Sequence, residues 1–130
     1  MTELSKGTVR LMRILSAIVL LAIAGIHLFL VFDGVGGVLG VLFILNAVAG
    51  VVLAIGMLAL HGRLGNIATV FGLLFVIASL LALVLALTVG LFSIRETWTF
   101  TLVPETIVID SIGVVLLALT TTFTFRPRLA

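Results

Sequence analysis

Four long apolar stretches constrain the fold of this chain more than any other feature of its sequence. They cover residues 14–32, 35–60, 67–92 and 106–125, with short connectors between them. A helix of about 20 mainly apolar residues crosses the roughly 30 Å of hydrocarbon in a bilayer. The sequence therefore predicts an all-α membrane protein whose transmembrane helices cover residues 12–32, 35–60, 66–92 and 105–125.

The composition excludes most other classes of protein. Of the 130 residues, 63% are hydrophobic and 9% are charged, whereas soluble domains are about 45–50% apolar and about 25% charged. Such a chain cannot cover a globular surface with polar groups, which excludes a soluble enzyme, a secreted module and a disordered segment. A net charge of +2 gives no electrostatic footprint for nucleic acid, and the absence of cysteine excludes disulfides and thiolate metal sites. We expect one four-helix domain over residues 1–130.

The distribution of cations predicts how the helices are oriented. If the amino terminus lies inside, six of the seven cations lie on the inner side, and only Arg95 lies outside: Lys6, Arg10, Arg13, Arg63, Arg126 and Arg128. Cations concentrate on the cytoplasmic side of membrane proteins, so we expect a multi-pass protein of the cell membrane with both termini cytoplasmic. This arrangement suits a bacterial inner membrane. The first apolar stretch is longer than the roughly 7–15 residues of a signal-peptide core, so we expect it to be retained as a helix.

The connector over residues 93–104 is the only long one. In it Thr97, Thr99 and Thr101 alternate with apolar residues, a period that suits an extended segment half buried on one face. We expect an outer interfacial loop with Trp98 at the level of the lipid headgroups. Pro104 then lies at the start of the fourth helix, where its missing N–H costs little.

Small residues form a stripe along each predicted helix. Close packing of small residues drives helix association in lipid, and a seven-residue spacing favours left-handed crossing near +20°. We therefore expect a compact left-handed antiparallel bundle with its stripes inward, although one stripe facing a partner subunit is the alternative. The stripes are Ala17, Ala24 and His27; Gly36, Gly40, Ala47, Gly50 and Ala54; Gly65, Gly72, Ser79 and Ala86; and Thr106, Asp110, Gly113, Thr120 and Thr124.

Asp110 is the candidate residue that says most about function. An acid at mid-membrane costs about 2.5–3.5 kcal/mol on insertion scales and usually has a partner inside the bundle. His27 lies at a similar depth and is the expected partner, with Arg95 as the rival. One interpretation is a proton or cation site of His27 and Asp110, with Glu105 in an outer funnel. The other is an ion pair or hydrogen bond that only fixes helix packing.

Other polar residues in the apolar stretches favour structural roles. Asn46 and Ser79 lie at comparable depth, so we expect a hydrogen bond between the second and third helices. The threonines of the fourth helix are expected to bond the carbonyl four residues earlier. His27 and His61 lie on opposite sides of the membrane and cannot share one haem, and one histidine with carboxylates matches no strong metal motif. We predict no metal and no cofactor.

No catalytic constellation is present in the sequence. It has no nucleophile–base pair, no phosphate-binding loop and no H-E-x-x-H helix, so we predict that the protein is not an enzyme. The leading expectation is an accessory or structural subunit of a larger membrane complex, in contact with the lipid bilayer and with other membrane subunits or further copies of itself. The alternatives are a small proton- or cation-coupled transporter that uses His27 and Asp110, and a bundle that binds a lipid or another apolar ligand between its helices.

Overall fold

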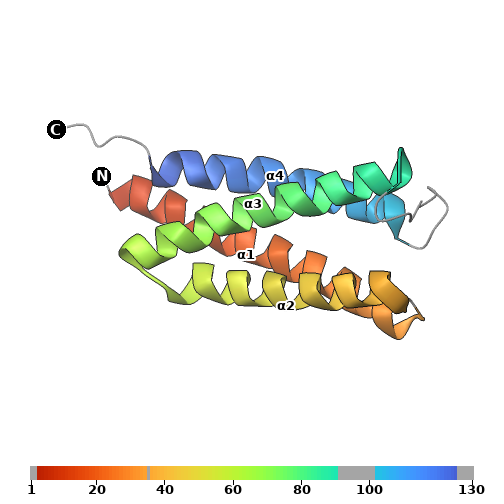
Figure 1. Cartoon of the computed structure of the whole chain (residues 1–130). Coiled ribbons are helices and arrows are strands. Elements are labelled where there is room, and N and C mark those ends of the chain that lie inside the picture. Colours follow the sequence, from red (N-terminus) through yellow and green to blue (C-terminus); the bar gives the residue numbers. More distant parts are fainter. Residues whose placement is uncertain (1–2, 35, 91–101, 126–130) are drawn as a thin grey trace.

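Residues 3–34, 36–90 and 102–125 are described by a computed structural model, and this part of the chain is all-helical. Each of its four helices is long and apolar enough to cross a membrane, which confirms the prediction of four helices of spanning length. The helices are α1 (Glu3–Phe32), α2 (Gly37–Ala59), α3 (Gly62–Leu87) and α4 (Val103–Thr124) (Figure 1).

The helix ends differ from the ends of the apolar stretches. α1 begins at Glu3 rather than at residue 12, because lysine and arginine are good helix formers and the helix continues beyond its apolar part. α3 ends at Leu87 rather than at residue 92. There the Gly90 amide, with a φ of 93°, donates to the Leu85 carbonyl at 2.7 Å, a bond typical of left-handed helix caps. Hydropathy therefore predicts the apolar part of each helix, whereas helix-forming charged residues and capping bonds determine where the helix begins and ends.

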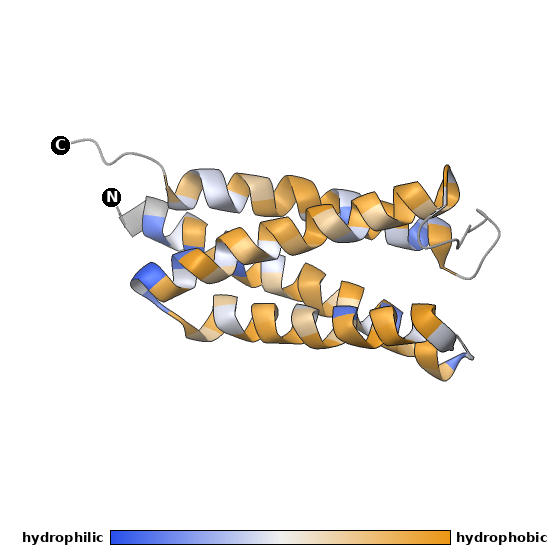
Figure 2. Cartoon of the chain, in the orientation of Figure 1, coloured by the Kyte–Doolittle hydropathy of each residue, from blue (hydrophilic) through white to orange (hydrophobic). Residues whose placement is uncertain are grey.

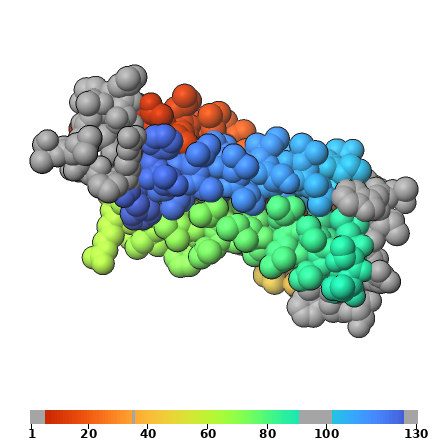
Figure 3. Space-filling model, turned by 90° about the horizontal axis from the view of Figure 1, so that it is seen from above, coloured from red at the N-terminus to blue at the C-terminus, as the bar shows by residue number. Residues whose placement is uncertain are grey.

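The helices form a ring in which each packs mainly on two neighbours. α1 contacts α2 and α4, and α3 contacts α2 and α4, while α1 and α3 barely touch across the centre. Seen from above, α4 lies between α1 and α3 (Figure 3). Neighbouring helices run in opposite directions (Figure 1). We call the end where α1 and α3 finish the Phe32 end, and the opposite end, at the α2–α3 turn, the His61 end.

Large apolar side chains cover the outside of the bundle. All four helices consist mostly of hydrophobic residues (Figure 2), and leucine, isoleucine, valine and phenylalanine side chains are exposed along their length. Water would strongly disfavour such a surface, whereas lipid tails match it. The exposed residues therefore suit a surrounding of hydrocarbon.

Small residues face inward, as their stripes predict. Nearly all stripe members on α2 and α3 are buried, and Gly36 is an exposed exception. A Cβ added at Gly50 would lie 3.0 Å from Ala24 Cβ, and one added at Gly113 would lie 2.9 Å from a Val76 methyl group. Glycine at these positions lets the backbones of neighbouring helices approach closely.

Candidate intramembrane binding site

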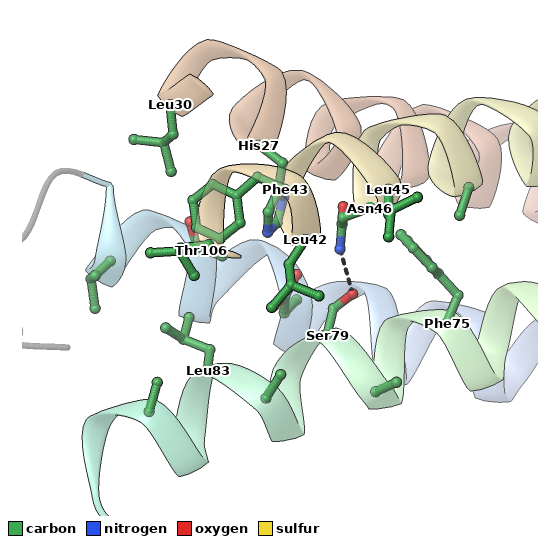
Figure 4. A pocket seen from close by; sticks show the side chains of 17 residues that line it. His27, Leu30, Leu42, Phe43, Leu45, Asn46, Phe75, Ser79, Leu83 and Thr106 are labelled. Atoms are coloured by element: carbon green, nitrogen blue, oxygen red, sulfur yellow. Dashed lines mark hydrogen bonds between the residues drawn. The ribbon is translucent and has the colours of Figure 1, made fainter. Parts of the chain in front are cut away.

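A mostly apolar cavity of about 400 Å³ lies in the half of the bundle nearest the Phe32 end. Side chains from all four helices line it (Figure 4). The lining of α2 includes Leu45, which is 59% exposed, and that of α3 includes the exposed Ala78. Because these exposed side chains belong to its wall, the cavity is open at the surface between α2 and α3.

A run of alanines on α3 creates part of this space. Ala78, Ala82 and Ala86 all line the cavity, and residues four apart lie on the same face of a helix. Their methyl groups leave room that larger side chains would fill. Ala86 belongs to the small-residue stripe predicted to pack against a neighbouring helix, and the four-residue spacing of all three alanines is the sequence signal for a hollow.

Asp110 is buried in the wall of this cavity. Its side chain is 0% exposed, and it lies seven residues into α4, about 10 Å from the helix start at 1.5 Å per residue. Within the described part of the chain, neither carboxylate oxygen has a hydrogen-bond partner. A buried charge without a partner is very costly, so this group requires a proton or a cation that the lining does not supply.

His27 lines the same cavity but does not bond Asp110. Its Nδ1 lies 2.8 Å from the Ile23 carbonyl oxygen. A carbonyl only accepts, so Nδ1 carries the proton of this bond, and in the neutral ring Nε2 is then an acceptor. The ring also meets Phe43 edge-on, with centroids 4.8 Å apart at 85°. The imidazole is thus oriented by α1 and α2 rather than by the acid.

Asn46 and Ser79 join α2 to α3 at the cavity wall. The Asn46 Nδ2 donates to Ser79 Oγ at 3.0 Å, while the amide oxygen points away from the serine (Figure 4). That oxygen is buried and has no hydrogen-bond partner among the described residues. The pair that the sequence assigned to helix packing therefore also presents an acceptor beside the cavity.

The threonines of α4 bond their own helix, as predicted. Thr106, which lines the cavity, donates to the Leu102 carbonyl at 2.6 Å, and Thr120 donates to the Leu116 carbonyl at 2.7 Å. The single hydroxyl proton of Thr106 is thus used within the helix. Its oxygen keeps acceptor capacity toward the cavity.

The remaining predicted site residues do not join this group. Glu105 is exposed and is not part of the cavity wall. Arg95, Trp98 and most of the 93–104 connector lie outside the described residues. Across residues 3–34, 36–90 and 102–125, no three histidine, cysteine, aspartate or glutamate side chains are grouped closely enough to hold a metal ion.

No protein-family model matches the chain, and neither a curated protein nor a solved structure matches it.

Proposed function

We propose that this protein binds a small, largely apolar molecule inside the membrane, in the cavity between its four helices. The observation that carries the proposal is the cavity itself, mostly apolar and open between α2 and α3. Ligand sites are typically apolar hollows of about 300–1,000 Å³ with a few polar groups. A volume of about 400 Å³ with a polar wall matches that description.

The cavity favours ligand binding over a purely structural role. Protein interiors are close-packed, and unfilled space costs stability because lining atoms lose their contacts. A subunit that only joins other proteins gains nothing from such a space. We therefore place ligand binding ahead of the accessory-subunit role expected from the sequence, and contact with other subunits or self-association is compatible with it.

The proposal includes an orientation in the membrane. Lys6, Arg10, Arg13 and Arg63 belong to helix segments at the His61 end, and this distribution supports a cytoplasmic His61 end. The cavity then lies in the outer half of the cell membrane, and both termini are cytoplasmic. The same proposal includes left-handed helix crossing, from the seven-residue spacing on α3, and a bacterial inner membrane.

A photolabel tests the proposed binding. A decanol carrying a diazirine is added to the protein in phosphatidylcholine nanodiscs, and labelled residues are mapped by peptide mass spectrometry. We expect label on the cavity wall. Ala82→Phe should lower this labelling about tenfold, the effect of losing roughly 1.4 kcal/mol of binding, because the new ring occupies the cavity.

Ala22→Phe is the matched control for this experiment. Ala22 is exposed on α1 and is not part of the cavity wall, so the same substitution there should leave the labelling unchanged. Equal labelling of wild type and Ala82→Phe would contradict ligand binding in the cavity.

Asp110 has no hydrogen-bond partner among the described residues, and this favours a second candidate function, proton- or cation-coupled transport. Protein in liposomes would then pass protons or cations, and Asp110→Asn would abolish the flux because the exchangeable charge is gone. Asp33→Asn, the same change at an exposed acid near the Phe32 end, is the control. Equal flux for wild type and Asp110→Asn would remove this function.

A further inference from the structure

The polar wall of the cavity offers several buried acceptors without partners, and its donors are the Ser79 hydroxyl and the second amide proton of Asn46. Asp110 contributes two carboxylate oxygens and Asn46 contributes its amide oxygen, all without partners among the described residues. The donor proton of His27 is used by Ile23, and that of Thr106 is used by Leu102. Acceptor groups from α1, α2 and α4 thus belong to the wall of one cavity, and those of Asp110 and Asn46 are buried without a described partner.

The charge of the wall points in the same direction. Among the residues that the structure describes, no lysine or arginine lines the cavity, and Asp110 is the only acidic residue that does. The acid is 0% exposed, and a cation bound at the carboxylate would supply the missing counter-charge. A hydrogen bond to a charged group is worth more than one between neutral groups.

Four head-group chemistries can be compared on these observations. A phosphate or carboxylate head would meet the like charge of the Asp110 carboxylate. A plain hydrocarbon would leave the acceptors unsatisfied. A quaternary ammonium has the right charge but no N–H group, whereas an ammonium that keeps its N–H groups supplies both the charge and the donors.

The rest of the wall fits an apolar body. Leu42, Phe43, Phe75 and Leu83 line the cavity beside the polar groups (Figure 4). An amphiphile can place its head at Asp110 and its hydrocarbon among these side chains. The opening between α2 and α3 lets such a molecule enter sideways from the lipid.

We infer that the ligand of this cavity is a hydrophobic amine, held by N–H donation from its protonated nitrogen to the Asp110 carboxylate. Asn46 Oδ1 is the second acceptor for the head, and the apolar body lies against the phenylalanines. This inference rests on the proposed function, since it names the chemical class of the ligand in the same cavity.

A matched series of head groups tests it. Decylamine, decyltrimethylammonium, decanol and decanoate compete with the diazirine-bearing decanol for wild-type protein in phosphatidylcholine nanodiscs at pH 7, where decylamine is protonated. We expect decylamine to compete at a mole fraction in the nanodisc lipid about tenfold or more below that of decanol, the ratio expected for one charge-assisted hydrogen bond. Decyltrimethylammonium should fall between them, and decanoate should be weakest.

Asp110→Asn should remove the advantage of decylamine while decanol competes as before, because only the charge is lost. Asp33→Asn, at an exposed acid outside the cavity wall, should keep it and thereby exclude a general surface-charge effect. If Asp110→Asn does not fold, the wild-type series decides alone. Equal competition by all four heads, or strongest competition by decanoate, overturns the inference while ligand binding stands. No label in the cavity at all overturns both.

The amine can come from a free amphiphile or from a lipid headgroup. Replacing phosphatidylcholine by phosphatidylethanolamine, which carries a primary ammonium, distinguishes the two sources. Reduced labelling indicates the lipid headgroup and unchanged labelling indicates a free amine. Either result, together with the decylamine preference, supports the same head-group chemistry.

Discussion

The two halves of the bundle treat buried polar groups differently. In the half nearest the His61 end, Ser16 donates to the Met12 carbonyl at 2.7 Å and its hydroxyl lies 3.1 Å from that of Thr120, while Thr69 donates to the Gly65 carbonyl at 2.9 Å. In the Phe32 half, Asp110 is equally buried but has no described partner. A polar side chain in one of these helices thus has a structural role where its hydrogen bonds are satisfied within the bundle. It is a candidate site where it lacks a partner and borders a cavity.

Arg13 qualifies this contrast at the His61 end. Its guanidinium packs over Gly65, where an added Cβ would collide with it, and its Nε and Nη2 have no hydrogen-bond partner among the described residues. Unlike Asp110, this side chain is only partly buried, and it does not line the cavity. The contrast therefore lies between the buried hydroxyls, which bond their own helix in both halves, and Asp110, which has no described partner.

Overfilling the tightly packed interior should have the largest effect on stability. At Gly113 even a Cβ would lie 2.9 Å from Val76 and 3.1 Å from Val19, so we expect Gly113→Leu to lower the free energy of unfolding by about 3 kcal/mol. Gly25 has nothing within 4 Å of an added Cβ, so Gly25→Leu should cost almost nothing. Reversible unfolding in mixed detergent micelles measures both. A similar loss for the two variants would show that close approach at Gly113 is unimportant.

Removing a leucine should cost more in the tightly packed half than at the cavity wall. Leu117 is fully buried in the core, and Leu117→Ala should lower the free energy of unfolding by about 2 kcal/mol, the lower range for buried leucines, because lipid supplies less hydrophobic driving force. Leu42 already borders open space, so Leu42→Ala should lower it by well under half as much. Equal losses in the same unfolding assay would mean that the cavity wall is packed as tightly as the core.

The hydrogen bond between α2 and α3 should have the smallest effect. A double-mutant cycle of Asn46→Ala and Ser79→Ala should give a coupling energy of about 0.6 kcal/mol, the average for bonds between membrane helices. The bond length of 3.0 Å makes the two residues direct partners, so a coupling near zero would contradict this contact. A saturating apolar ligand should leave the coupling unchanged if Asn46 Nδ2 stays on Ser79 while its oxygen binds the head.

The four helices and the inward-facing side of each could be predicted from the sequence, but the cavity between the helices could not. Hydropathy located the four helices, and depth along them placed Asn46 beside Ser79. Depth also placed His27 near the level of Asp110, but the bond expected between them is absent, because His27 Nδ1 bonds the Ile23 carbonyl. The hydropathy pattern could not predict that α1 begins at Glu3, because charged residues extend a helix without lengthening its apolar part. It could not predict the cavity either, since a stripe such as Ala78, Ala82 and Ala86 favours close contact or a hollow according to how near the facing helix lies.

The side opening of the cavity has a consequence for how affinity is judged. A molecule that reaches Asp110 between α2 and α3 first dissolves in the leaflet, so its partition coefficient sets the concentration that the protein meets. A weak intrinsic association can then give high occupancy at a low aqueous dose. A ranking of ligands by their bulk aqueous concentrations would favour the most hydrophobic compound. Only a ranking by mole fraction in the bilayer would reveal which head groups the polar wall prefers.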